Sequence, residues 1–168
     1  MKTLIHVALI ASLAAPLAWS AGTVKVYTPD SEKPKTLTHA EHLLDLVGQP
    51  RLANSWWPGA VIAERQKTAE AEQQHKALLA RLTGLAEQED GDDAAAINSV
   101  RQQLQALKVT GRQNVNLDPD EVRVTEKGNP TLEGEYTLWL PEKPTTVTVM
   151  GLISSPGKKP FTPGRDVA

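Results

Sequence analysis

Residues 63–107 read AERQKTAEAEQQHKALLARLTGLAEQEDGDDAAAINSVRQQLQAL, and this stretch decides the fold. Gln, Glu, Lys, Arg and Ala dominate it, and its few apolar side chains recur at helical spacing along two narrow faces. The two faces hold His75, Leu78, Leu82 and Leu85, and Ile97, Val100, Leu104 and Leu107. Between them, the acidic residues 87–93 contain Gly91 and offer Asp92 or Asp93 as a helix N-cap. The stretch therefore predicts a helical hairpin that packs on itself and contacts the rest of the molecule lightly.

The residues before this hairpin predict two strands and a helix. Residues 23–27 alternate between apolar and polar side chains, as a half-buried strand does, and residues 35–37 give a short return strand after a polar turn. Thr38 and Glu41 have the spacing of a capping box, which predicts a helix that begins there and ends at Gly48.

Strand character returns after the hairpin, and residues 135–140 predict a further strand. Other apolar side chains alternate around a turn at residues 118–120, namely Val115, Leu117, Val122 and Val124. A strand hairpin followed by a helix of about ten residues opens a β-grasp unit, as it opens many other α+β folds, and strands return after the helical stretch. We expect residues 21–144 to form this domain, with the flanking strands in one sheet and residues 63–107 inserted outside it.

The C-terminal residues predict the beginning of a second module. Residues 141–144 read as a linker, residues 146–151 as a strand, and residues 155–157 as the turn after it. Only about 23 residues of this module are present, and a domain of fewer than about 40 residues rarely holds its own core. We therefore expect residues 145–168 to be the first hairpin of a second β-grasp domain that is truncated.

The N-terminal residues 1–20 have the pattern of a secretory signal peptide. Lys2 precedes an apolar run, and Ala18 and Ser20 stand at the −3 and −1 positions of a cleavage site before Ala21. The run is short for crossing about 30 Å of hydrocarbon, so we favour cleavage over an uncleaved membrane anchor. The chain has no cysteine, which excludes disulfides and a lipid-modified N-terminal Cys. These features predict a periplasmic protein.

Composition and motifs argue against several classes of function. The formal net charge of −2 does not favour nucleic acid or an anionic membrane surface as a partner. His39 and His42 lie one helical turn apart but lack a third ligand, so we expect no metal site. No nucleophile elbow or cofactor-binding loop occurs, so we expect neither catalytic residues nor a cofactor.

Several short runs resemble the capsule biosynthesis GfcC family. They lie in order along the mature chain, with the helical hairpin between them: residues 56–60 (WWPGA), 99–104 (SVRQQL), 110–112 (TGR), 117–120 (LDPD) with 122–124 (VRV), and 134–138 (GEYTL). The resemblance implies a signal peptide and two β-grasp domains, the first carrying an inserted helical hairpin. It also implies a likeness to the periplasmic β-grasp domains of the Wza-type polysaccharide export channel. Residues 147–165 resemble only the first hairpin of the second, soluble-ligand-binding (SLBB-like) domain.

Three residues are candidates for ligand binding. The resemblance implies a binding role for Arg112, whose guanidinium donors match carboxylates or sugar hydroxyls. The alternative is a structural arginine that bridges hairpin and sheet through Asp118 or Asp120. Trp56 and Trp57 suit either sugar stacking or the core. Because adjacent residues of an extended segment point in opposite directions, we expect one ring to be buried and the other partly exposed.

We therefore expect a non-enzymatic accessory protein of capsule or exopolysaccharide assembly or export. Its partners would be capsular or extracellular polysaccharide, the outer-membrane polysaccharide export machinery, or both. The alternative is a carbohydrate-binding module centred on Arg112. A polysaccharide-modifying enzyme is less favoured, since it needs two carboxylates about 5–10 Å apart across a cleft, for which Asp118, Asp120 and Glu121 are the candidates.

Overall fold

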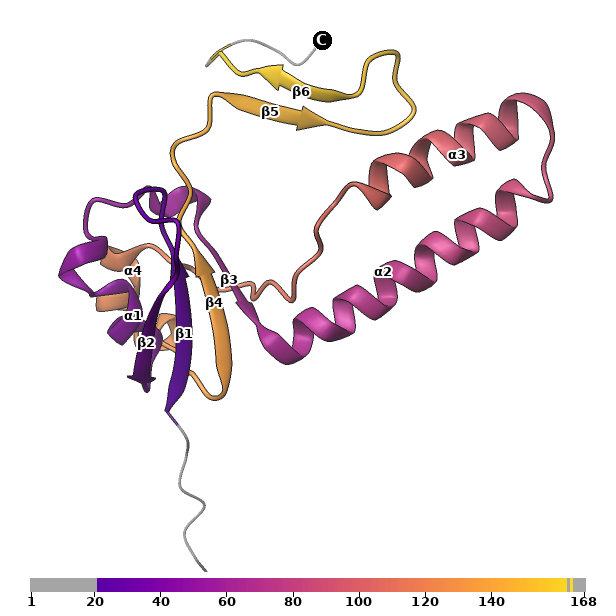
Figure 1. Ribbon diagram of the computed structural model, residues 1–168. Helices are drawn as coiled ribbons and strands as arrows, with labels where there is room; N and C mark the ends of the chain where they lie inside the picture. Colours follow the sequence, from indigo (N-terminus) through magenta and orange to yellow (C-terminus); the bar gives the residue numbers. More distant parts are fainter. Residues whose placement is uncertain (1–20, 163, 165–168) are drawn as a thin grey trace, which may run out of the picture.

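The computed structural model describes residues 21–162 and residue 164, so the expected signal peptide lies outside the described residues. The strands are β1 (Gly22–Tyr27), β2 (Lys35–Ala40), β3 (Val61–Glu64), β4 (Glu135–Trp139), β5 (Thr146–Val149) and β6 (Gly157–Pro160). The helices are α1 (Leu43–Val47), α2 (Arg65–Ala86), α3 (Gly91–Gln105) and α4 (Pro119–Val124), with 3-10 turns η1 (Pro50–Leu52), η2 (Trp57–Gly59) and η3 (Glu126–Gly128) (Figure 1).

Four strands from both sides of the helical stretch form one mixed sheet in the order β2-β1-β4-β3. β1 pairs antiparallel with β2 and parallel with β4, and β3 pairs antiparallel with β4. β3 directly precedes the helical hairpin and β4 follows it, yet they are neighbours, with Val61 opposite Trp139 and Glu64 opposite Tyr136. The α+β class is thus confirmed, and the sheet is compatible with a β-grasp-like fold.

The core lies on one face of this sheet. Strand alternation directs Val24, Val26, Ile62 and Leu138 to that face, where each is at most 2% exposed. α1 and α4 cover it, and in Figure 1 both helices lie on the side of the sheet opposite the helical hairpin. We call the other side of the sheet, which faces the helical hairpin, the open face.

The helix predicted from Thr38 begins later, because β2 extends to Ala40. Pairing of Gly22 with Ala40 holds this segment in the sheet, with an irregularity at which His39 adopts a positive φ of 63°. The capping box assigned to Thr38 and Glu41 was wrong. The Asp45 carboxylate instead accepts hydrogen bonds from the backbone N–H groups of Glu41 (3.0 Å) and His42 (2.9 Å).

Residues 119–124 form helix α4, so the turn predicted at residues 118–120 and the strand alternation read from Val122 and Val124 were wrong. Asp118 is the N-cap, and its Oδ1 accepts a hydrogen bond from the Asp120 backbone N–H at 2.9 Å. Pro119 occupies the first helical position, where the missing N–H carries no cost. Val122 is buried against the core whereas Val124 is 82% exposed, so the apparent alternation was accidental.

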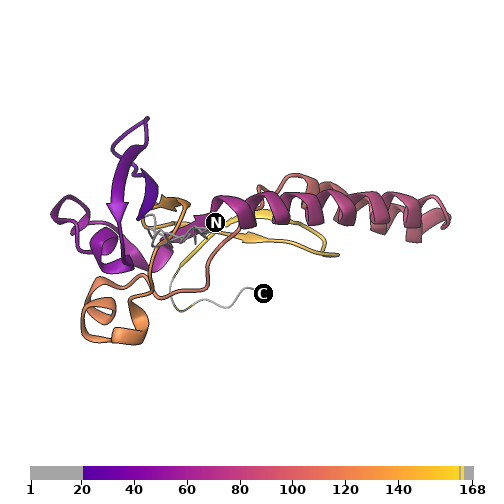
Figure 2. The ribbon, with the colours of Figure 1, turned by 90° about the horizontal axis from the view of Figure 1, so that it is seen from below.

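The helical hairpin was predicted correctly in kind, and Figure 2 shows it extending away from the sheet. No residue of α2 or α3 is buried, in agreement with light contact to the body. Two details differ from the prediction. The N-cap of α3 is Asp90, ahead of Gly91 with a φ of 61°, and the predicted apolar faces include three exposed residues, Leu78, Leu85 and Leu107.

β5 and β6 form a separate antiparallel sheet of two strands. The connection between β5 and β6 forms hydrogen bonds with α3. The Gln103 amide donates a hydrogen bond to the Gly151 carbonyl (3.2 Å) and accepts one from the Gly151 N–H (2.9 Å). Throughout the described residues, no helix combines the length and apolar character needed to cross a bilayer.

Candidate functional site

Trp56 lines two cavities. The half-buried indole ring lies over Gly59, where a β-carbon would come within 2.0 Å of Trp56 Cζ3 and 2.9 Å of Pro141 Cγ. The glycine of the Trp-Trp-Pro-Gly run is therefore needed for the ring position, and residues 56–59 act as one local unit.

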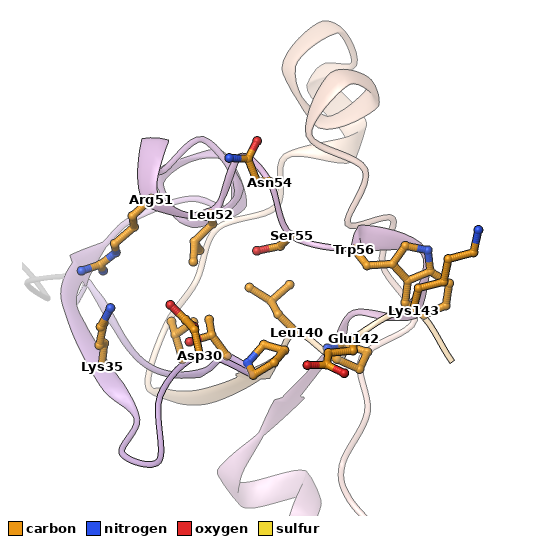
Figure 3. A pocket seen from close by; sticks show the side chains of 14 residues that line it. Asp30, Lys35, Arg51, Leu52, Asn54, Ser55, Trp56, Leu140, Glu142 and Lys143 are labelled. Atoms are coloured by element: carbon orange, nitrogen blue, oxygen red, sulfur yellow. The ribbon is translucent and has the colours of Figure 1, made fainter. Parts of the chain in front are cut away.

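The first cavity, which we call the Trp56 cavity, has a volume of about 390 Å³ (Figure 3). Its floor is apolar and includes Val26, Leu52 and Leu140. Charged and polar side chains lie around these residues: Asp30, Lys35 and Arg51 on one side, Glu142 and Lys143 beside the Trp56 ring on the other, and Asn54 and Ser55 between the two sides. An aromatic ring and an apolar floor ringed by hydrogen-bonding groups suit a polar organic ligand with apolar faces.

Asp30 is ionised at neutral pH. A hydrogen bond from the Thr28 side chain is the main reason that the pKa of the Asp30 carboxyl lies below its ordinary value. A hydrogen bond from its own backbone and the charge of Lys35 act in the same direction. The Trp56 cavity therefore presents a carboxylate acceptor close to the ammonium of Lys35.

The second cavity lies beside Trp56 and has a volume of about 460 Å³. It brings Trp56 and Trp57 together with Asp118 and Asp120 at the start of α4 and with Arg123 in its last turn. Trp57 is half-buried and packs against the core, and its Nε1 is buried with no hydrogen-bond partner among the described residues.

Arg112 lies apart from both tryptophans. Residues 111–113 add to the free edge of β3, since Gln113 N–H donates to the Ile62 carbonyl (2.8 Å) and Arg112 stands opposite Ala63. The Arg112 side chain is exposed and lines neither cavity described above. Within residues 21–162, no ion pair joins it to Asp118 or Asp120.

The carboxylates at the start of α4 have structural partners. Asp118 caps the helix, Asp120 forms an ion pair with Arg123 at 3.5 Å with 92% of its side chain exposed, and Glu121 accepts a hydrogen bond from the Asn116 amide. They lie on one helix start rather than across a cleft. Among the described residues, no group of three or more His, Cys, Asp or Glu side chains is placed to hold a metal ion.

Trp56 was a candidate from the sequence, whereas its charged neighbours in the cavity were not. Asp30 comes from the β1–β2 turn, Arg51 from η1, and Glu142 from the segment after β4. These residues are separated by up to 112 positions, and no local pattern links them. Their one shared signal is that each belongs to a polar connection beside a proline, at Pro29, Pro50 and Pro141.

Comparison with known proteins identifies the family. Residues 20–143 match the family model described as "Capsule biosynthesis GfcC, N-terminal". The chain is also 65% identical over 162 residues to the "Uncharacterized protein YjbG" of Escherichia coli strain K12. That alignment covers 96% of this chain and 66% of the E. coli protein, so the chain spans slightly less than two thirds of its relative. The chain therefore belongs to the capsule biosynthesis GfcC family.

Proposed function

We propose that this chain is a periplasmic, non-enzymatic accessory protein of capsule or exopolysaccharide assembly that holds a segment of glycan in the Trp56 cavity. Family membership supports the process, and the predicted signal peptide supports the compartment. The observation that carries the glycan-binding role is the Trp56 ring at the edge of an apolar floor ringed by Asp30, Arg51 and Asn54. The apolar face of a pyranose packs on an indole ring, while carboxylate, guanidinium and amide groups pair with its hydroxyls.

A docking role toward the export machinery is the second candidate. We propose that residues 145–168 begin a second β-grasp module, as the family resemblance implies. β5 and β6 pair only with each other among the described residues, and their connection exposes Leu152 (69%) and Ile153 (44%). Strand edges and exposed apolar side chains of this kind suit contact with a partner protein.

Isothermal titration calorimetry with capsular oligosaccharide fragments tests the glycan-binding role. Trp56→Ala is expected to weaken binding about tenfold or more, equivalent to about 1.4 kcal/mol, because it removes the stacking surface. Arg112→Ala is the matched comparison, since Arg112 is exposed outside the cavity. An affinity that Trp56→Ala leaves unchanged would refute the assignment to this cavity, and a loss confined to Arg112→Ala would favour the module centred on that residue.

A further inference from the structure

The open face of the sheet carries a cavity of its own, which we call the hairpin cavity. Because side chains alternate along a strand, β1 and β4 bury Val24 and Leu138 on the core side and direct Lys25, Thr137 and Trp139 to the opposite side. These three residues line a volume of about 550 Å³. None of its lining residues is shared with the Trp56 cavity.

The helical hairpin supplies the opposite wall. Thr68, Ala69 and Glu72 come from the first turns of α2, and Lys108 and Thr110 come from the segment that returns from α3. β3 ends at Glu64 and α2 begins at Arg65, so no loop separates strand from helix. The insertion thus creates a cavity that the sheet alone would not have.

An aromatic pair borders this cavity. Tyr27 and Trp139 are directly opposite each other in the parallel pair β1–β4, and their rings stack with centroids 6.1 Å apart and planes 14° from parallel. Trp139 lines the cavity and Tyr27 is 37% exposed. Because the two rings support each other on adjacent strands, they form a pre-organised apolar platform.

Positive charge is in excess in the lining. Arg65 and Glu135 pair with each other at 2.6 Å. The remaining charged groups of the lining are two exposed lysines, Lys25 and Lys108, and one carboxylate, that of Glu72. Positive charges therefore outnumber negative charges. Hydroxyl groups of Thr23, Thr110 and Thr137 lie among these charges and can donate to or accept from a ligand.

We propose that the hairpin cavity binds an acidic saccharide, with a sugar ring on Trp139 and a sugar carboxylate between Lys25 and Lys108. The aromatic platform and the hydroxyls favour a sugar over a simple anion, and the two lysines favour an acidic sugar over a neutral one. This site shares no lining residue with the Trp56 cavity, so a long polymer has two places to bind on this chain.

Titration with trimannuronate and with the neutral trisaccharide mannotriose, monitored by the indole N–H signals in NMR spectra, tests the proposal. The wild-type protein is expected to bind trimannuronate at least fivefold more tightly than mannotriose, with the largest shift at Trp139. The double substitution Lys25→Gln and Lys108→Gln is expected to bring the two affinities within about twofold. Lys76→Gln, an exposed lysine of α2 outside the cavity, is expected to change neither affinity.

Equal affinities of the wild-type protein for the two trisaccharides would overturn the proposal, as would a double variant that binds trimannuronate like wild type. Changes in chemical shift confined to the indole N–H signal of Trp56 would also overturn the proposal, and they would support the role of the Trp56 cavity. Conversely, Trp56→Ala is expected to leave the Trp139 shift intact, so that failure of one site is distinguishable from failure of the other. Because Lys25 and Lys108 are exposed, the variants should remain folded, which the dispersion of the same spectra verifies.

Discussion

Replacing Gly111 with alanine tests how the helical hairpin is anchored to the sheet. A β-carbon at Gly111 would lie 2.3 Å from the Lys67 carbonyl carbon and 2.3 Å from the Thr68 nitrogen. Ordinary contact begins near 3.4 Å, and both atoms belong to the backbone of the first turn of α2. Neither can rotate away, so α2 and the return segment must separate by about an ångström.

The expected cost follows from the contacts that this separation disturbs. Forced overpacking costs about 1–3 kcal/mol. The shift also strains two hydrogen bonds, from Gly111 N–H to Thr68 Oγ1 (3.0 Å) and from Glu64 N–H to the Gly111 carbonyl (3.2 Å). Each contributes about 1 kcal/mol. We expect Gly111→Ala to lower the free energy of unfolding by about 3 kcal/mol, measured by urea denaturation with tryptophan fluorescence.

Gly84 provides a matched comparison within the same hairpin. It lies inside α2, and a β-carbon there would meet no atom within 4 Å. Gly84→Ala should therefore stabilise the helix by about 0.5–1 kcal/mol, seen as a higher midpoint in thermal unfolding followed by far-ultraviolet circular dichroism. If the free energy of unfolding of Gly111→Ala lies within about 0.5 kcal/mol of the wild-type value, the close approach of the return segment to α2 does not constrain residue 111.

Two further substitutions probe the α4 cap and the β5–β6 contact. Asp118→Ala removes the N-cap of α4 and is expected to lower the free energy of unfolding, measured by urea denaturation, by about 1 kcal/mol. Asp118→Asn keeps a capping side chain and should retain most of that stability. Equal losses for the two variants would contradict the capping role. Gln103→Ala is expected to speed hydrogen exchange of the Gly151 amide, because it removes the acceptor of that N–H. Gln102→Ala, an exposed position on the same helix, is the control. Unchanged exchange in Gln103→Ala would show that the contact does not hold the β5–β6 connection.

Local patterns were sufficient to predict secondary structure where one composition and one periodicity continued over many positions. The helical hairpin carries its own composition and spacing over residues 63–107, so α2 and α3 were predicted without knowledge of their surroundings. Residues 23–27 and 135–140 likewise alternate within the segment itself, and both form strands.

Prediction failed where a neighbouring segment changed the outcome. Val122 and Val124 have the spacing of a strand after the predicted turn at residues 118–120, but the Asp118 cap and packing of Val122 on the core favour a helix. Thr38 and Glu41 look like a helix start, but pairing of β2 with β1 keeps residues 38–40 in the sheet. At residues 38–40 a tertiary contact outweighed the local pattern, and at residues 119–124 a local cap and core packing did so together.

The amino-acid sequence by itself determined the α+β class, the helical hairpin and the resemblance to the capsule biosynthesis family, because these depend on periodicity and short runs that are local in the chain. Only the tertiary structure decided which side chains share a cavity. The Trp56 cavity joins Asp30, Arg51 and Glu142, and the hairpin cavity joins Lys25, Lys108 and Trp139. The parallel pairing of β1 with β4 across more than 100 residues brings Asp30 near Glu142 and Lys25 near Trp139, and other segments add Arg51 and Lys108. Neither spacing nor composition encodes such contacts.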